Sequence, residues 1–231
     1  MKGLRILNAW LVLICIFTTS EICFAWHDET HIAVAKAAGY RKWYNACGAD
    51  MAKLKAGAIE AHNHYVNNRP RNVVTPEIIF SQVDKYNQID LNGHLYGAII
   101  ASVRDSIREK RKGKYGEYHL GFCCHYVADL SQPLHNIAYN LFNREHHESI
   151  DGIINDEVLD NLQKIKIYPI TIDSEEALAK EVARIANISL RLGYKIELEG
   201  RLLTQEEAYG QISHSASLFK AILKYVLLQC K

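Results

Sequence analysis

The chain has 231 residues, of which 48% are hydrophobic, so it has enough apolar side chains to bury a sizeable core. Its formal net charge of +1 excludes the strong overall positive field that gathers nucleic acid. The four cysteines beyond residue 25 show no spacing that specifies disulfides, and they suit core positions at least as well as bridges.

The first 25 residues have the pattern of a secretory signal peptide. Lys2 and Arg5 precede an apolar run, and the small residue Ala25 suits a cleavage site. The run is shorter than the roughly 20 apolar residues that a membrane span needs, which favours a cleaved leader over a retained anchor. We therefore predict a chain that is secreted or periplasmic after cleavage between Ala25 and Trp26, without an integral membrane anchor. The mature part, 26–231, has 206 residues, is formally neutral and suits one domain.

The mature chain is predicted to be all-α. Apolar residues recur at helical spacing in six segments. These segments are 30–40, 75–86, 94–110, 117–130, 173–194 and 204–228. Start signals precede three of them, at Thr75, at Asp173 or Ser174, and at the Thr204 capping box. Only 165–172 is strand-like, and it is too isolated to build a sheet, so we predict a single-domain helical bundle.

The most unusual stretch of the chain is HYVADLSQPLH, which places metal-binding side chains in a segment apolar enough to be core. His125 and Asp129 are four residues apart, so they share one face of a helix and can reach one ion. Pro133 is expected to end that helix, and His135 lies just beyond it. His135 is therefore close enough to serve a neighbouring ion rather than the same one.

A second pair of donors follows in HHESID. His147 and Asp151 are again four residues apart, on what the sequence suggests is a helix start. Either pair alone would also suit a solvated helix surface or a buried hydrogen bond. Together with His135, the two pairs place five nitrogen or carboxylate donors within 27 residues, and that density indicates a metal site.

The predicted mature terminus adds further donors. Cleavage after Ala25 would leave Trp26 with a free α-amino group, a nitrogen donor with a reference pKa of about 8. His31 lies five residues further on.

These motifs in this order resemble the zinc-dependent phospholipase C and single-strand-specific zinc nuclease superfamily. The motifs are an N-terminal tryptophan, W-x4-H, H-x3-D-x5-H with QPLH, and H-x3-D, and they extend over most of the mature chain. The resemblance implies an all-helical fold with three zinc ions in a cleft. It also implies one ion on Trp26, His31 and Asp129, one on His125 with Asp129 as a bridging carboxylate, and one on His135, His147 and Asp151.

The sequence departs from the family pattern in GAIEAHNHY, residues 57–65. His62 stands where the Gly-x4-Asp element of the family has its aspartate. Glu60 and His64 are four residues apart and could supply the carboxylate and the imidazole instead. We expect Glu60 or His62 as one ligand and His64 as another, and Glu60 is also a candidate for orienting the reactive water. The alternative is that one or two of these residues are polar surface.

The donor types point to a reaction class. Imidazole, carboxylate and amine donors without paired thiolates suit catalytic zinc better than a closed structural site. Clustered zinc ions lower the pKa of a shared water and bind phosphoryl oxygens, which suits hydrolysis of an anionic phosphodiester. We therefore predict a secreted zinc-dependent phosphodiester hydrolase, and no protein partner is implied.

The substrate is predicted to be a phospholipid rather than single-stranded nucleic acid. The twelve-residue spacing from His135 to His147 resembles the phospholipase branch, and the neutral mature chain agrees with it. QPLH and Asp151 resemble the nuclease branch, so a zinc nuclease is the alternative enzyme. A third hypothesis is a non-catalytic exported zinc-binding protein, favoured by the departure at 57–65, and the number of bound zinc ions separates it from the enzymes.

Overall fold

The structure is a computed structural model that describes residues 26–230. The predicted signal peptide, residues 1–25, lies outside the described residues. Within 26–230 the chain forms one helical domain without strands, which confirms the all-α prediction. No helix in this range is long and apolar enough to cross a membrane.

The described part of the chain forms α-helices joined by loops and short 3-10 turns. In chain order these elements are α1 (Asp28–Ala37), η1 (Trp43–Asn45), α2 (Gly48–Ala56), α3 (Ala58–Ala61), α4 (Pro76–Val83), α5 (Leu95–Arg111), α6 (Glu117–Ser131), η2 (Pro133–Asn136), α7 (Leu141–Asp151), α8 (Asn155–Val158), η3 (Leu162–Lys164), α9 (Glu175–Glu199) and α10 (Gln205–Gln229).

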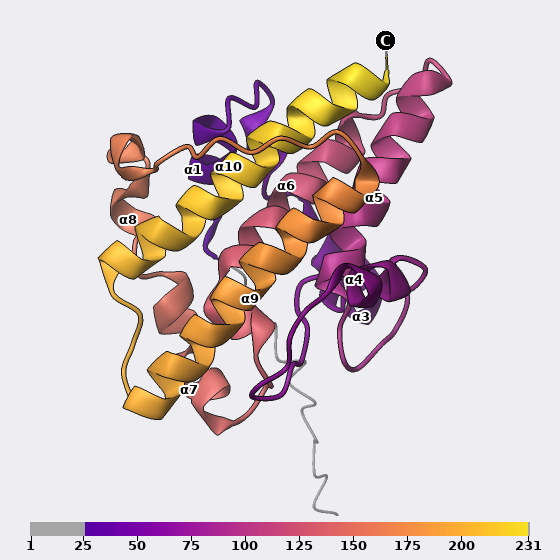
Figure 1. Cartoon of the computed structure of the whole chain (residues 1–231). Coiled ribbons are helices and arrows are strands. Elements are labelled where there is room, and N and C mark those ends of the chain that lie inside the picture. The colour runs from indigo at the N-terminus through magenta and orange to yellow at the C-terminus, as the bar shows by residue number, and fades with distance from the viewer. Residues whose placement is uncertain (1–25, 231) are drawn as a thin grey trace, which may run out of the picture.

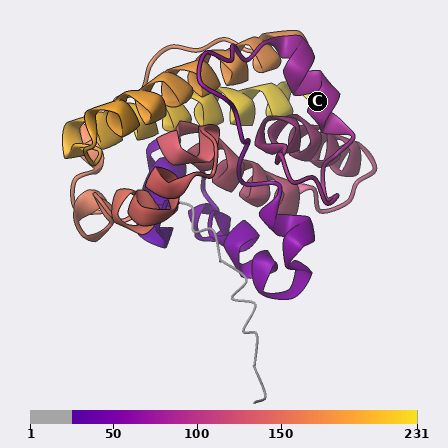
Figure 2. The same ribbon diagram turned by 90° about the horizontal axis from the view of Figure 1, so that it is seen from below.

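The three longest helices, α5, α9 and α10, pack around α6. Figure 1 shows α9 and α10 side by side across one face, with α5 and α6 behind them. Every residue of α6 from Leu120 to Ser131 is buried, because α5, α9 and α10 cover it on several sides. Viewed from below, the segment from η1 to α3 lies on the side of the molecule away from α9 and α10 (Figure 2). The central helix therefore has both a core-forming face and a face that meets α1 and α2.

Local capping explains where three of the helices begin. The side chains of Thr75, Ser174 and Thr204 each accept a hydrogen bond from a backbone N–H in the first turn that follows. The capping box of Thr204 and Glu207 is complete. The predicted starts are confirmed, and Ser174 rather than Asp173 is the cap of α9.

The strand-like segment 165–172 lies against α10 instead of pairing with another strand. The backbone N–H of Lys166 donates to Ser213 Oγ (2.9 Å), and that of Tyr168 donates to Ser217 Oγ (2.8 Å). Alternate residues of the extended segment thus meet side chains one helical turn apart, and the segment crosses α10 in Figure 1.

One helix boundary differs from the expectation. The sequence suggested that His147 and Asp151 stand at a helix start, but they lie in the second half of α7, and Asp151 is its last residue. The helix begins earlier because Asn140 caps it by accepting a hydrogen bond from the N–H of Asn143 (3.0 Å). The cysteines beyond residue 25 are free, and Cys123 and Cys124 are buried in the core, as expected for small apolar residues.

Close packing positions the turn after α6. A Cβ added at Gly193 of α9 would lie 2.8 Å from the carbonyl oxygen of Pro133 and 2.7 Å from Cγ2 of Ile137. Only glycine permits this approach of α9 to η2, the element that carries His135.

Candidate metal centre

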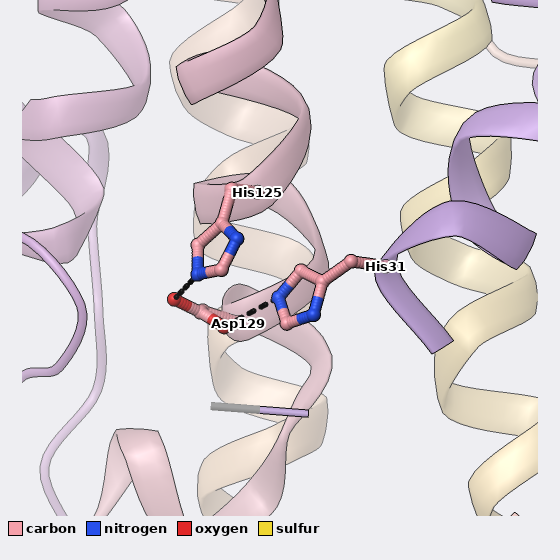
Figure 3. A group of neighbouring side chains, drawn as sticks. All are labelled: His31, His125 and Asp129. Atoms are coloured by element: carbon pink, nitrogen blue, oxygen red, sulfur yellow. Dashed lines mark hydrogen bonds and ion pairs between the residues drawn. The ribbon is translucent and has the colours of Figure 1, made fainter. Parts of the chain in front are cut away.

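The first group of donors joins α6 to α1. His125 and Asp129 are fully buried on α6, and His125 Nε2 lies 3.4 Å from Asp129 Oδ2. His31 of α1 places its Nε2 3.1 Å from Asp129 Oδ1, and its ring stacks on that of His125 at 3.8 Å between centroids. Figure 3 shows His31 reaching from α1 toward the pair on α6. The predicted one-face arrangement of His125 and Asp129 is confirmed, and one ligand atom from each of the three residues could hold a metal ion.

A second group contains an aspartate that the sequence reading missed. Asp50 of α2 lies with Oδ1 3.4 Å from His125 Nε2 and 3.9 Å from Nδ1 of His64. His64 follows α3 and also places Nδ1 2.9 Å from Asp129 Oδ2. Asp50, His64 and His125 could hold a metal ion together. The two groups therefore share His125, and Asp129 faces His31 with one oxygen and His64 and His125 with the other.

The third group lies on η2 and α7. His135 Nε2 is 3.1 Å from His147 Nε2, which is 3.3 Å from Asp151 Oδ2. These three buried residues could hold one metal ion, and they are the set that the resemblance implies for the third ion. Gln132 fixes both sides of the group, since its side-chain N–H donates to Asp151 Oδ1 while its oxygen accepts from the N–H groups of Leu134 and His135.

The ring nitrogens that face away from the groups are all tied to acceptors. Three rings donate through Nδ1 to backbone carbonyl oxygens: His31 to that of His27 (3.4 Å), His125 to that of Ala46 (2.8 Å) and His135 to that of His64 (2.6 Å). The other two donate to side chains: His147 Nδ1 to Asn143 Oδ1 (2.6 Å) and His64 Nε2 to Glu60 Oε1 (3.2 Å). In its neutral form each ring therefore presents a lone pair to its group, which is the orientation that ligating histidines adopt.

The His135 and His147 pair shows why a cation fits. The amide of Asn143 is oriented by its own donation to the carbonyl of Leu134 (2.8 Å), so its oxygen is the atom that meets His147. Two neutral rings held this way point lone pairs at each other across 3.1 Å, with the Asp151 carboxyl beside them. Such an arrangement is stabilised by a metal ion or by extra protons.

The pKa shifts of the buried ionisable groups differ between the donor groups. Burial alone would lower the pKa of His125, but Asp50 and Asp129 raise it to about 9. Burial would raise the pKa of Asp129, yet His125 and His135 hold it well below its usual range. Burial raises the pKa of Asp151 well above its usual range, against a hydrogen bond from Gln132. Protons on these groups must leave when a metal binds, so metal affinity is tied to pH.

The remaining predicted ligands lie apart from the three groups. Glu60 is buried behind His64, where Oε1 accepts hydrogen bonds from Tyr126 Oη (2.6 Å) and His64 Nε2. Nδ1 of His62 has no hydrogen-bond partner, and its ring packs at 5.9 Å from that of Tyr65. The structure thus brings seven of the predicted ligands together, His31, His64, His125, Asp129, His135, His147 and Asp151, and it places Glu60 and His62 outside the sets.

Trp26 lies next to the centre. It is fully buried in an apolar cluster that includes Ile150 of α7. The N–H of the following residue, His27, points to the carbonyl oxygen of Asp151 (3.4 Å), and the carbonyl of His27 faces His31. The start of the described chain is therefore held between the residues of the first and third groups.

Asp50 carried a weak signal in the sequence. It has no donor four residues away, and its neighbours in GADMAKLKA are mostly small or basic. The resemblance leads one to expect an aspartate and a histidine between the first and central motifs, and Asp50 and His64 both lie in that interval, with Asp50 upstream of the departure at 57–65.

No protein-family model matches the chain, and no curated protein matches it in sequence. The resemblance to the zinc-dependent superfamily therefore stays a prediction from the motifs.

Proposed function

We propose that this chain is an exported zinc-dependent phosphodiester hydrolase with phospholipase C-like activity. The observation that carries the proposal is the set of three adjoining donor groups, two of which share His125. Their donors are imidazoles and carboxylates, and no thiol belongs to these groups of described residues. Such donors suit catalytic zinc, whereas structural sites are usually closed by thiolates.

The chain's own residues have distinct roles in this proposal. Zinc, when bound, would supply an activated water and a charge that stabilises phosphoryl oxygens. Asp129 holds His31 and His64 on opposite sides through its two oxygens, so it sets the spacing of the first two sites. Lys53 places its ammonium 2.7 Å from Asp50 Oδ1, which adds positive charge beside the centre for an anionic diester.

The phospholipid substrate is favoured by the chain's organisation. His135 and His147 are joined by a short connection through η2 and the first half of α7, as in the phospholipase branch that the motifs resemble. The formally neutral mature chain gives no overall field for collecting a polyanion.

A direct assay tests the proposal. The chain beginning at Trp26 is purified, loaded with zinc, analysed for metal content and incubated with phosphatidylcholine vesicles, single-stranded DNA, RNA and a chromogenic phosphodiester. We expect three zinc ions per chain and release of a phosphorylated head group from the vesicles. Cleavage of DNA or RNA without lipid hydrolysis would favour the nuclease. One zinc ion or none, with all substrates intact, would favour the non-catalytic protein.

A further inference from the structure

Seven of the exposed large apolar side chains lie on elements that contact one another, and we name the surface they form the η1–α2 surface. It comprises Trp43, Tyr44, Met51, Leu54 and Ile59 on η1, α2 and α3, together with Tyr115 just before α6 and Tyr118 in its first turn. Leu54 is 71% exposed and Met51 64%, although both occupy a helix that packs against α6 on its other side. Figure 2 shows η1, α2 and α3 on the side of the molecule away from α9 and α10.

Side-chain contacts join the two parts of this surface. Lys42 beside η1 donates to Tyr115 Oη (3.0 Å) and lies 4.5 Å from the centre of that ring. Phe122 of α6 packs against the backbone of Gly48 at the start of α2 and lies 4.5 Å from the ring of Tyr118. The segment before α6 is thus tied to Lys42 beside η1, and the aromatic residues of α6 lie against the start of α2.

The same surface is basic. Between residues 36 and 59 the chain has five lysines and arginines and a single acid, Asp50, which belongs to the metal centre and pairs with one of the five, Lys53. Arg41 and Lys55 are exposed, and Lys36 lies 4.4 Å from the centre of the Trp43 ring. Aromatic rings among basic groups, with aliphatic side chains exposed beside them, suit the boundary between lipid head groups and acyl chains.

We propose that the η1–α2 surface docks the protein on an anionic lipid bilayer. Basic side chains would attract the negative leaflet, and Met51, Leu54 and Ile59 would enter its apolar boundary. These aliphatic side chains favour lipid over single-stranded nucleic acid, because bases stack on aromatic rings and not on aliphatic chains. Asp50 of the metal centre and Met51 are consecutive residues of α2. A bilayer that takes up Met51 would therefore lie close to the metal centre, with its phosphodiester head groups near the donors. This last step rests on the proposed function, whereas the docking itself does not.

Trp43 provides a built-in probe for the test. The chain from Trp26 onward has two tryptophans, and Trp26 is fully buried while Trp43 is exposed. Emission is recorded within seconds of mixing with vesicles of phosphatidylcholine alone or with about 30% phosphatidylglycerol, and binding is measured by sedimentation. We expect a blue shift and binding with the anionic vesicles, both weakened by added salt. Trp43→Phe should remove the shift without removing the binding.

Two pairs of variants make the test specific. Met51→Ser with Leu54→Ser should reduce vesicle binding at least about fivefold, whereas Leu198→Ser on α9, which is 88% exposed, should leave it unchanged. Lys55→Glu should weaken binding, whereas Lys224→Glu on α10 should not. All four proteins should keep the wild-type melting temperature and the wild-type rate on a soluble chromogenic phosphodiester.

The outcomes separate docking from catalysis. Equal vesicle binding by the wild type and the Met51 and Leu54 double variant would overturn the docking proposal. So would a loss in that double variant confined to single-stranded DNA binding or to self-association, each measured beside the vesicles. Vesicle binding by a chain that hydrolyses no phosphodiester would keep the docking surface and overturn the proposed function instead.

Discussion

The donors around Asp129 and those around His147 are assembled in different ways. The Asp129 side draws on α1, α2, the segment after α3, and α6, and His31 and Asp129 are 98 positions apart in the chain. The His147 side takes all its donors from seventeen consecutive residues, 135–151. The first side exists only when the tertiary fold is complete, whereas the second depends on one turn and one helix.

The two sides also differ in charge. Asp50 and Asp129 together face three histidines, and the pKa of each carboxyl is held below its usual range against the opposing effect of burial. Asp151 is the lone carboxyl of its group, and burial raises its pKa. A cation on the Asp129 side would link segments that are distant in the chain. A cation on the His147 side would replace protons on His135, His147 or Asp151, which lie within seventeen consecutive residues.

Replacing Asp129 should have the largest effect. Asp129→Ala removes oxygens that face both of the first two groups, so we expect the loss of about two bound ions and a fall in hydrolysis of at least about a thousandfold. Asp151→Ala should remove about one ion. Metal analysis and rates on a soluble phosphodiester measure both effects, and equal ion losses in the two variants would refute the role of Asp129 in both of the first two groups.

The His147 side can be tested with adjacent histidines. His147→Ala should lose about one ion and most of the activity, because Nε2 of His147 is a donor of the third group. His146→Ala is the matched control, since the His146 ring packs on Phe142 at 4.6 Å and belongs to no donor group. A larger loss in the His146 variant would show that the wrong histidine was chosen.

The predicted N-terminal ligand lies between the two sides. A chain that begins at Trp26 offers a free α-amino group, whereas one extra methionine before it converts that nitrogen to an amide, a poor donor at neutral pH. We expect the extended form to lose about one zinc ion and much of its rate. Identical metal content and identical rates in the two forms would rule out the amine as a ligand.

The smallest effect is expected at Glu60. Glu60→Gln keeps an oxygen near His64 Nε2 but removes the carboxylate charge, so zinc affinity on the Asp129 side should fall about tenfold. Tyr126→Phe keeps the carboxylate and removes one hydrogen bond to it, so its effect should be smaller. Competition with a chelating dye measures the affinities, and equal weakening of the His147 side would contradict a local role for Glu60.

Local signals in the sequence predicted most of the fold. Caps at Thr75 and Thr204 involve side chains only three residues from their partners, so they can be read without tertiary information. The same holds for His125 and Asp129, which share a helix face by spacing alone. The start of α7 was misplaced because Asn140, an ordinary loop residue in the sequence, acts as its cap.

The residues that meet only through tertiary packing were harder to predict. Asp50 joins His64 and His125 because α2 packs against α6, and no local spacing reports that contact. Glu60 and His64 are neighbours, as their spacing suggested, but the carboxylate meets the ring nitrogen that faces away from the metal group. Spacing predicts which side chains are close, and the direction of each ring is set by the surrounding helices.

Gly193 links α9, a helix that supplies no donor, to the turn that carries His135. A Cβ at position 193 would meet the backbone oxygen of Pro133 at 2.8 Å, so a residue with a side chain at this point of α9 would push the helix away from η2. The close approach of this 25-residue helix to η2 thus depends on glycine. A single methyl group at position 193 would therefore shift the turn that carries His135, and so would disturb the centre from a helix that supplies none of its donors.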